Sequence, residues 1–224
     1  MEASASRTKF MMKYILFDLD GTLTESAPGI INSIKHTYAH YGITDYDERE
    51  LEKFVGPPLI ESFMRYCGFT EEKAREAVDV YREYFSTKGL FENAVYNGIP
   101  KCLAALKSAG YVLAVATSKP QVFCERILDH FSLAEYFSVV KGIPLDDEKM
   151  TKAQVIERAL DALGVTDKRE AIMVGDRDYD IKGAKENGIE CVGVLYGYGS
   201  RSELESAGAS AICETVDDLS AYFI

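Results

Sequence analysis

The sequence is poor in the residues that usually bind structural metals or form disulfides. It has only three histidines in 224 residues, and none of its cysteines forms a C-x-x-C pair. A zinc site is therefore not expected, and an odd number of scattered cysteines does not favour a disulfide framework. The five cysteines are Cys67, Cys102, Cys124, Cys191 and Cys213. This usage favours a reducing, cytoplasmic setting.

Long apolar runs and basic tracts are also missing. No apolar run approaches the roughly 20 residues that a membrane span needs. The first residues, MEASASRTKFMMK, lack a signal-peptide core; we expect a disordered leader and a natural start near Met11 or Met12. The net charge of −11 argues against nucleic acid as a partner, because a phosphate backbone needs a basic surface. A small anion is compatible with this charge, since it responds to the local field of its pocket.

The spacing of apolar residues divides the chain into two regions. Residues 14–18 predict a short buried strand, and residues 25–92 then show helical spacing with no strand. Strands and helices alternate from residue 98 onward. The expected strands are 111–116, 137–140, 171–174, 190–195 and 211–213, and the expected helices are 99–109, 119–130, 151–163, 178–187 and 201–207.

This alternation predicts a parallel sheet covered by helices on both faces. The strands are continuous apolar runs, as burial on both faces requires. We therefore predict an α/β fold with a doubly wound, Rossmann-like core made of residues 1–24 and 93–224. An all-helical insert, residues 25–92, interrupts this core after its first strand.

Polar side chains follow the strands at the edge where such sheets bind ligands. The groups are Asp18 and Asp20 after the first strand, Thr117-Ser118-Lys119 after the second, and Gly175-Asp176 after the strand 171–174, with Asp178 and Asp180 close behind. Side chains at i and i+2 of a strand point the same way, so Asp18 and Asp20 repel each other. Two unit charges ~4 Å apart repel by about 4 kcal/mol at an effective dielectric of 20. A cation is needed to offset this repulsion.

Two helix starts are expected beside these carboxylates. Thr151 and Gln154 predict a capping box, which places Lys152 in the first helical turn. The helix dipole disfavours a cation there, so this lysine indicates an anion at the same place. Ser118 and Gln121 predict a second capping box, whose free N–H groups would suit an oxyanion. Several hard oxygen ligands beside a phosphate site suit Mg²⁺.

Four motifs in this order resemble those of the haloacid dehalogenase-like phosphatases. They are D-x-D-G-T-L, T-S-K, a lysine near a helix start, and G-D-x-x-x-D, and they cover most of residues 14–180. The helical insert resembles the cap of that family, which would select the substrate. The tail, GYGSRSELESAGASAICETVDDL, resembles the phosphoglycolate-phosphatase-like branch.

The resemblance implies a phosphatase that forms an aspartyl-phosphate. Asp18 would be the nucleophile, and Asp20 would protonate the leaving oxygen and then activate water. Thr117 would bind a phosphoryl oxygen, with Ser118 beside it. Lys152 would balance the charge of the nucleophile and the phosphate.

The resemblance also implies the metal ligands. Mg²⁺ would be held by Asp18, the carbonyl of Asp20 and Asp176, with Asp180 as a direct or water-mediated partner. Asp178 competes with Asp180 for this role, and the family spacing favours Asp180. Many relatives place the lysine in a K-P-x-P run, whereas this chain has K-M-T-K-A-Q, so that Lys149 is an alternative to Lys152.

Several functions fit these residues. The first is a phosphatase acting on a small phosphorylated metabolite such as phosphoglycolate, and the alternatives are a 5′-nucleotidase or a sugar-phosphate mutase. A dehalogenase is disfavoured because Asp20 is present. A phosphoacceptor signalling receiver is about half this length and lacks an insert, and a non-catalytic binding module would not need the full set of polar groups. Gly197-Tyr198-Gly199 does not complete a G-x-G-x-x-G nucleotide loop and predicts a turn. No oligomeric state is predicted.

Overall fold

The chain forms two compact units. The computed structural model describes residues 12–145, 147 and 149–224, and the predicted leader before them lies outside this range. The first unit holds the residues up to Thr24 together with Val95–Ile224, and the second holds Glu25–Ala94. The chain leaves the first unit at β2 (Thr24–Glu25) and returns at β3 (Ala94–Val95). These two strands pair with each other, which the sequence did not predict.

A six-stranded sheet forms the centre of the first unit. Its order is β5-β4-β1-β6-β7-β8, and the strands pair in parallel. The strands are β1 (Tyr14–Phe17), β4 (Val112–Pro120), β5 (Val139–Ile143), β6 (Ala171–Gly175), β7 (Glu190–Val194) and β8 (Ala211–Cys213). The predicted α/β fold is confirmed, although β4 continues well beyond the predicted end at residue 116.

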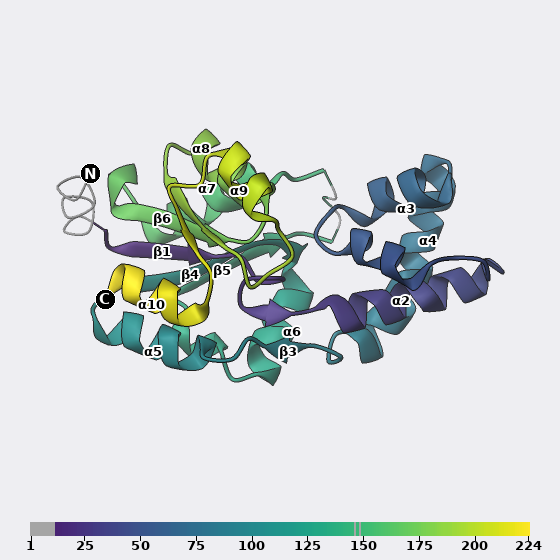
Figure 1. Ribbon diagram of the computed structural model, residues 1–224, viewed down its shortest axis with the longest axis horizontal. Coiled ribbons are helices and arrows are strands. Elements are labelled where there is room, and N and C mark those ends of the chain that lie inside the picture. Colours follow the sequence, from purple (N-terminus) through teal and green to yellow (C-terminus); the bar gives the residue numbers. More distant parts are fainter. Residues whose placement is uncertain (1–11, 146, 148) are drawn as a thin grey trace. The chain divides into compact units, whose positions relative to one another are not determined.

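Helices cover both faces of this sheet. Figure 1 shows α7, α8 and α9 over one face and α5, α6 and α10 over the other. Their bounds are α5 (Ile99–Ser108), α6 (Gln121–His130), α7 (Lys152–Leu163), α8 (Asp178–Glu186), α9 (Arg201–Ala207) and α10 (Val216–Phe223). Helix α10 was missed from the sequence. Its capping box, Thr215 with Asp218, was a readable signal.

The middle of the sheet is fully buried. Ile15, Leu16 and Phe17 of β1 have no exposed surface, because β4 and β6 flank the strand and helices cover both faces. Burial of one such side chain contributes about 1.5–3 kcal/mol. Val155 and Ile156 of α7 pack into the same core. This packing fixes the carboxyl end of β1, where Asp18 follows.

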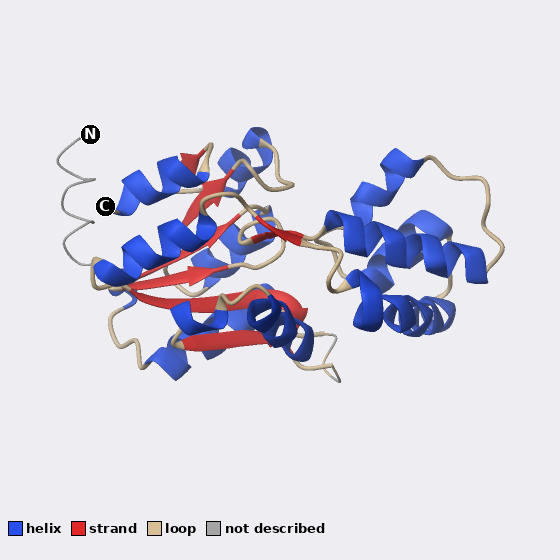
Figure 2. Ribbon diagram, turned by 90° about the horizontal axis from the view of Figure 1, so that it is seen from below, coloured by secondary structure: helices blue, strands red, loops and turns tan. Residues whose placement is uncertain are grey.

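The second unit is built from helices, as Figure 2 shows. They are α2 (Ala27–His40), a 3₁₀-helix η1 (Glu48–Phe54), α3 (Leu59–Cys67), α4 (Glu71–Tyr84) and a π-helix η2 (Phe85–Gly89). Helices α2 and η2 approach closely at two glycines. A Cβ on Gly29 would lie 1.9 Å from the carbonyl oxygen of Gly89, so only glycine fits there.

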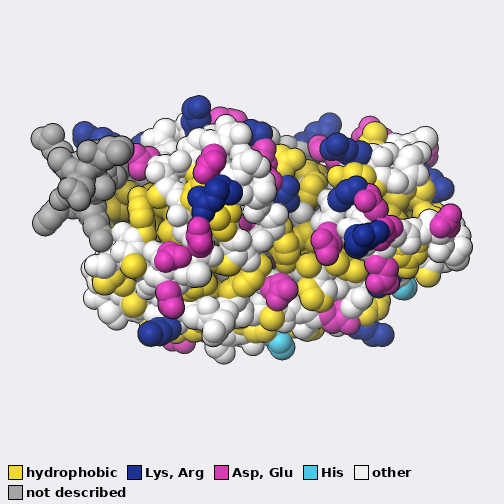
Figure 3. All heavy atoms as spheres, viewed as in Figure 1, with side chains coloured by type: hydrophobic (Ala, Val, Ile, Leu, Met, Phe, Trp, Pro, Cys, Tyr) yellow, Lys and Arg dark blue, Asp and Glu magenta, His cyan; other side chains and the backbone are white. Residues whose placement is uncertain are grey.

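The surface and the cysteines agree with the composition. Acidic and basic side chains are interspersed on the face shown in Figure 3, so the net negative charge is not gathered into one patch there. All five cysteines lie in the described part of the chain and are free thiols. Among the helices that the structure describes, none has the length and apolar character needed to cross a membrane.

Candidate active site

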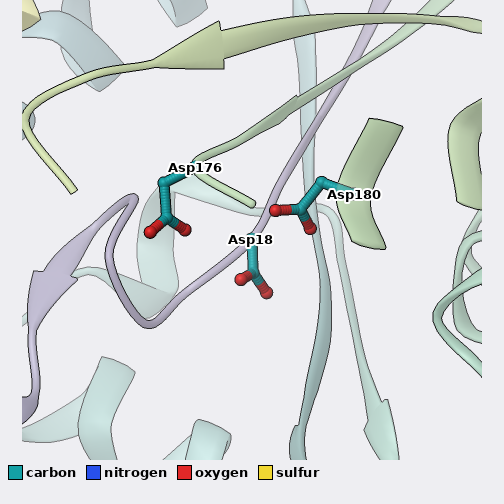
Figure 4. Close-up of side chains that lie close together, drawn as sticks. All are labelled: Asp18, Asp176 and Asp180. Atoms are coloured by element: carbon teal, nitrogen blue, oxygen red, sulfur yellow. The ribbon is translucent and has the colours of Figure 1, made fainter. Parts of the chain in front are cut away.

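Three aspartates from separate segments meet at the carboxyl edge of the sheet. Asp18 follows β1, Asp176 follows β6, and Asp180 lies in the first turn of α8. Figure 4 shows the three side chains close together. One carboxylate oxygen of each lies within 4.8 Å of those of the other two. Asp176 and Asp180 are buried, and the side chain of Asp18 is 13% exposed.

The sheet register brings these residues together. Phe17 of β1 pairs with Val174 of β6, so the residues after the two strands leave the sheet side by side. The backbone N–H of Asp18 donates to the carbonyl of Val174 at 2.9 Å. Gly175 leaves room for the next acid, because a Cβ there would lie 2.2 Å from the Cγ of Asp180.

Lys152 lies against this acidic cluster. Its Nζ is 2.7 Å from Oδ1 of Asp18 and 2.6 Å from Oδ1 of Asp180, and its side chain is 6% exposed. The predicted capping box is present: the Thr151 hydroxyl accepts from the N–H of Gln154, whose side chain accepts from the N–H of Thr151. The first turn of α7 thus places the lysine in the site, whereas the alternative, Lys149, is exposed.

Asp20 has a different partner from Asp18. Both of its carboxylate oxygens accept from Nζ of Lys119, at 2.9 and 2.7 Å. The two aspartates of the D-x-D motif therefore each contact a separate ammonium group. The sequence shows Lys119 only as part of T-S-K. It does not predict this contact, since the two residues are 99 positions apart and no local pattern relates them.

The end of β4 carries Thr117, which is buried, and Ser118, which is exposed. The predicted capping box of Ser118 with Gln121 is wrong. Strand β4 runs on to Pro120, which precedes α6 without any side-chain cap. The Gln121 amide instead bonds backbone groups of β5, donating to the Val140 carbonyl and accepting from an N–H. Ser118 is therefore not at a capped helix start.

The segment Gly197-Tyr198-Gly199 bends after β7 and holds Asp176. The N–H of Tyr198 donates to Oδ2 of Asp176 at 2.8 Å, and the hydroxyl of Thr22 donates to its Oδ1 at 3.3 Å. A Cβ on Gly197 would lie 2.2 Å from the carbonyl oxygen of Gly21. The glycine thus allows the loop backbone to approach the site, a role that its sequence did not predict.

The charges of the site shift several pKa values. Burial raises the pKa of Asp176 well above its usual value, and the carboxylates of Asp180 and Asp18 raise it further. Burial likewise raises the pKa of Asp180 to about 6, although Lys152 opposes the change. Burial alone would lower the pKa of Lys152, but the charges of Asp18 and Asp180 raise it above its usual value.

This cluster fits a divalent cation. Three carboxylates with one oxygen each inside a 4.8 Å radius of one another form a compact set of hard oxygen ligands, the kind that Mg²⁺ prefers. Lys152 contacts Asp18 and Asp180, and burial still raises the pKa of Asp180 and of Asp176. A dication among the three carboxylates would add further positive charge.

Comparison with known proteins identifies the family. The model of the haloacid dehalogenase-like hydrolase family matches residues 15–194. The chain belongs to the haloacid dehalogenase-like hydrolases. The matched range of this hydrolase chain includes β1 from its second residue on, the whole helical unit, and the positions of Thr117, Asp176 and Asp180.

Curated relatives of this haloacid dehalogenase-like hydrolase have several names. A 5′-nucleotidase of Pseudomonas aeruginosa is 45% identical over 199 residues, which cover 89% of this chain and 90% of that protein. The tyrosine-protein kinase PtkA of Mycobacterium tuberculosis is 38% identical, covering 92% and 70%. A phosphoglycolate phosphatase of Aquifex aeolicus is 32% identical, covering 84% and 86%.

A solved structure supports the same assignment. The crystal structure of a predicted phosphatase from Clostridium acetobutylicum superposes with a TM-score of 0.89 at 50% sequence identity, covering 94% of this chain and 97% of that one. The haloacid dehalogenase-like fold therefore extends over nearly the whole chain, including the helical insert.

Proposed function

We propose that this chain is a Mg²⁺-dependent phosphatase that hydrolyses small phosphomonoesters through an aspartyl-phosphate at Asp18. The observation that carries this proposal is the position of the Asp18 carboxylate, 2.7 Å from the ammonium of Lys152 and beside Asp176 and Asp180. A carboxylate alone repels a phosphate ester. The ammonium and a bound dication offset that repulsion and allow an attack on phosphorus.

The residues divide the reaction into two steps. In the first, Asp18 attacks phosphorus, the bond to the leaving oxygen breaks, and Asp20 donates a proton to that oxygen. In the second, Asp20 takes a proton from water, the water oxygen attacks phosphorus, and Asp18 is released together with inorganic phosphate. Lys152 and the hydroxyl of Thr117 bind the phosphoryl oxygens throughout.

The metal has a limited, defined part in this proposal. Asp18, the carbonyl of Asp20 and Asp176 would hold Mg²⁺, with Asp180 as a direct or water-mediated partner. When bound, the ion supplies charge stabilisation at the phosphoryl oxygens. Asp176 is already oriented for this purpose by the N–H of Tyr198.

Two relatives support a proposal for the substrate class. Identity of 45% with a 5′-nucleotidase favours a nucleoside monophosphate. Phosphoglycolate, the first expectation from the sequence, has support from a 32% identical relative and now ranks second. The 38% identity with PtkA raises one competing activity, a protein kinase, in which the phosphoryl group would be passed to a tyrosine rather than to water.

A substrate panel with three variants tests this proposal. Phosphate release from nucleoside monophosphates, phosphoglycolate, hexose phosphates and p-nitrophenyl phosphate would be ranked by kcat/KM with and without Mg²⁺. We expect release to require Mg²⁺, to be lost in Asp18→Asn, and to persist in Asp161→Asn, which removes an exposed carboxylate from α7. Asp20→Ala should slow turnover in a folded protein.

Three outcomes would contradict the proposal. Turnover that survives in Asp18→Asn removes Asp18 as the nucleophile. Isomerised hexose phosphate without free phosphate identifies a mutase. Phosphotyrosine formed from ATP, with no release of phosphate from any ester, identifies a kinase.

A further inference from the structure

We propose that Lys119 is a positioning residue that holds Asp20 in place for both proton transfers. This inference rests on the proposed function, because it concerns the residue assigned there as the acid and base. Lys119 has no role in the mechanism that the four motifs imply. The observation behind it is the contact of one ammonium group with both carboxylate oxygens of Asp20, at 2.9 and 2.7 Å.

The contact between Lys119 and Asp20 is largely shielded from solvent. The side chain of Lys119 is 5% exposed and that of Asp20 is 18% exposed. Taking an ammonium out of water is unfavourable unless a partner and hydrogen bonds compensate. Fixing a lysine side chain also costs rotamer entropy. A lysine held here therefore indicates a defined geometry for the carboxylate rather than an incidental surface pair.

Neighbouring strands fix the direction of Lys119. Phe17 of β1 pairs with Val115 of β4, so the two strand ends that carry Asp20 and Lys119 leave the sheet as neighbours. The Thr117 hydroxyl accepts from the N–H of Lys119 at 3.2 Å. On the other side, a Cβ on Gly142 of β5 would lie 2.5 Å from the Lys119 carbonyl oxygen. The backbone at Lys119 is thus held between a hydrogen bond and a tight strand contact.

Each aspartate of the D-x-D motif contacts a different lysine. Lys152 contacts Asp18 and Asp180, and Lys119 contacts Asp20. Without Lys119, the Asp20 carboxylate would keep its repulsion from Asp18 and lose the contact that opposes it. We expect it to turn toward solvent, away from the leaving oxygen and the attacking water. A displacement of about 1 Å in a catalytic group can cost about 100-fold in rate.

A positioning role differs measurably from direct binding of a substrate anion. If Lys119 acts through Asp20, its removal lowers kcat and leaves KM unchanged or lower. If it binds an anionic group of the substrate, its removal raises KM. The two chemical steps also distinguish the two roles. The departure of p-nitrophenolate needs no proton, so loss of a well-placed Asp20 should leave the first step fast. The attack of water still needs Asp20 as a base, so the second step should become slow.

The experiment compares Lys119→Met, Asp20→Asn and the double variant with p-nitrophenyl phosphate at saturating Mg²⁺. We expect Lys119→Met to lower kcat by about 10–100-fold without raising KM, because KM falls when hydrolysis of the intermediate becomes slower than its formation. Rapid mixing should show a stoichiometric burst of nitrophenolate before a slow steady state. The double variant should be no slower than Asp20→Asn alone, because two residues that act as a unit do not give multiplied losses.

Two further variants complete the design. Lys119→Arg keeps the charge and should recover part of the rate, and Lys101→Met removes an exposed lysine of α5 and should leave kcat unchanged. Circular dichroism melts show whether each variant folds. If Lys119→Met does not fold, Lys119→Gln enters the same comparison and, with Lys119→Arg, decides the question.

The inference is overturned by unchanged kcat in Lys119→Met, by losses that multiply in the double variant, or by a raised KM at constant kcat. Its failure is distinct from failure of the proposed function. In the first case the unaltered enzyme releases phosphate, Asp18→Asn is inactive and Lys119→Met is fully active. In the second case Asp18→Asn is as active as the unaltered chain, or no ester releases phosphate at all.

Discussion

Replacing Lys152 with methionine tests how the acidic cluster is stabilised. Methionine keeps the length and apolar stem of the side chain but removes the ammonium that lies 2.7 Å from Asp18 and 2.6 Å from Asp180. Three carboxylates then remain together, two of them buried. We expect the metal-free variant to be markedly less stable than the unaltered chain.

The magnitude follows from the burial of the pair. Removing one partner of a buried ion pair costs about 3–5 kcal/mol. In a protein of this size, each kcal/mol shifts Tm by about 2–4 °C, so the metal-free variant should melt roughly 6–20 °C lower. Mg²⁺ at about 100 times its Kd adds about 2.7 kcal/mol and should restore part of the loss. Activity should stay low, because the proposed mechanism also needs Lys152 to bind the phosphate.

The pH dependence of this loss has a defined sign. The pKa of Asp180 is raised to about 6, above its usual value, so its protonated form favours the folded state. That contribution is present at low pH and is lost as the pH rises through about 6. Removing Lys152 strengthens the preference for the proton, so the drop in Tm should be larger at pH 8 than at pH 5.

Differential scanning calorimetry of metal-free protein measures these differences, with Lys101→Met as the control for loss of an exposed lysine. A Tm within about 1 °C of the unaltered chain at pH 8 would refute the reasoning, because a loss of 3–5 kcal/mol cannot produce so small a shift. A loss that is greater at pH 5 than at pH 8 would show that the sign of the linkage is wrong.

Three other predictions concern single positions. Asp180→Asn should raise the Mg²⁺ concentration needed for half-maximal activity by about 10–100-fold, whereas Asp178→Asn should have little effect; equal effects would reopen the choice between them. Gly197→Ala should also weaken Mg²⁺ binding, measured by calorimetric titration, because the new methyl group would displace the loop that holds Asp176; unchanged affinity would contradict this role. Gly29→Ala should lower the free energy of unfolding in urea by about 1–3 kcal/mol, since its Cβ overlaps a carbonyl oxygen of the π-helix, and unchanged stability would mean that the two helices separate at no cost.

The fold was largely predictable because its elements are strongly patterned. The continuous apolar runs at β1 and β6 allow only a strand buried on both faces, and alternation with helices then fixes a parallel sheet. The end of β4 was not predictable in the same way. Its last residues are mostly polar. Their pairing with β5 involves a shift in register between Ala116 and Pro120, which apolar periodicity does not predict.

The site, like the fold, has parts that the sequence predicts and parts that depend on tertiary contacts. The closeness of Asp18, Asp176 and Lys152 could be predicted, because the two aspartates follow strands and the lysine lies within a capping box, and both features leave local signals. The contact of Lys119 with Asp20 left none, since it depends on which strands are neighbours in the sheet. The closeness of Gly197 to Asp176 is also a tertiary contact, and the glycines around it suggested only a turn.

The central claim is that a phosphoryl group is transferred to Asp18, and trapping that intermediate tests it most directly. The enzyme would be mixed with its best substrate and Mg²⁺, quenched in acid within milliseconds, digested, and examined by mass spectrometry for phosphorylated peptides. We predict a hydroxylamine-labile phosphoryl group on the peptide that contains Asp18, and no label in Asp18→Asn. A phosphoryl group on another residue, or full turnover with no labelled peptide, would contradict the account.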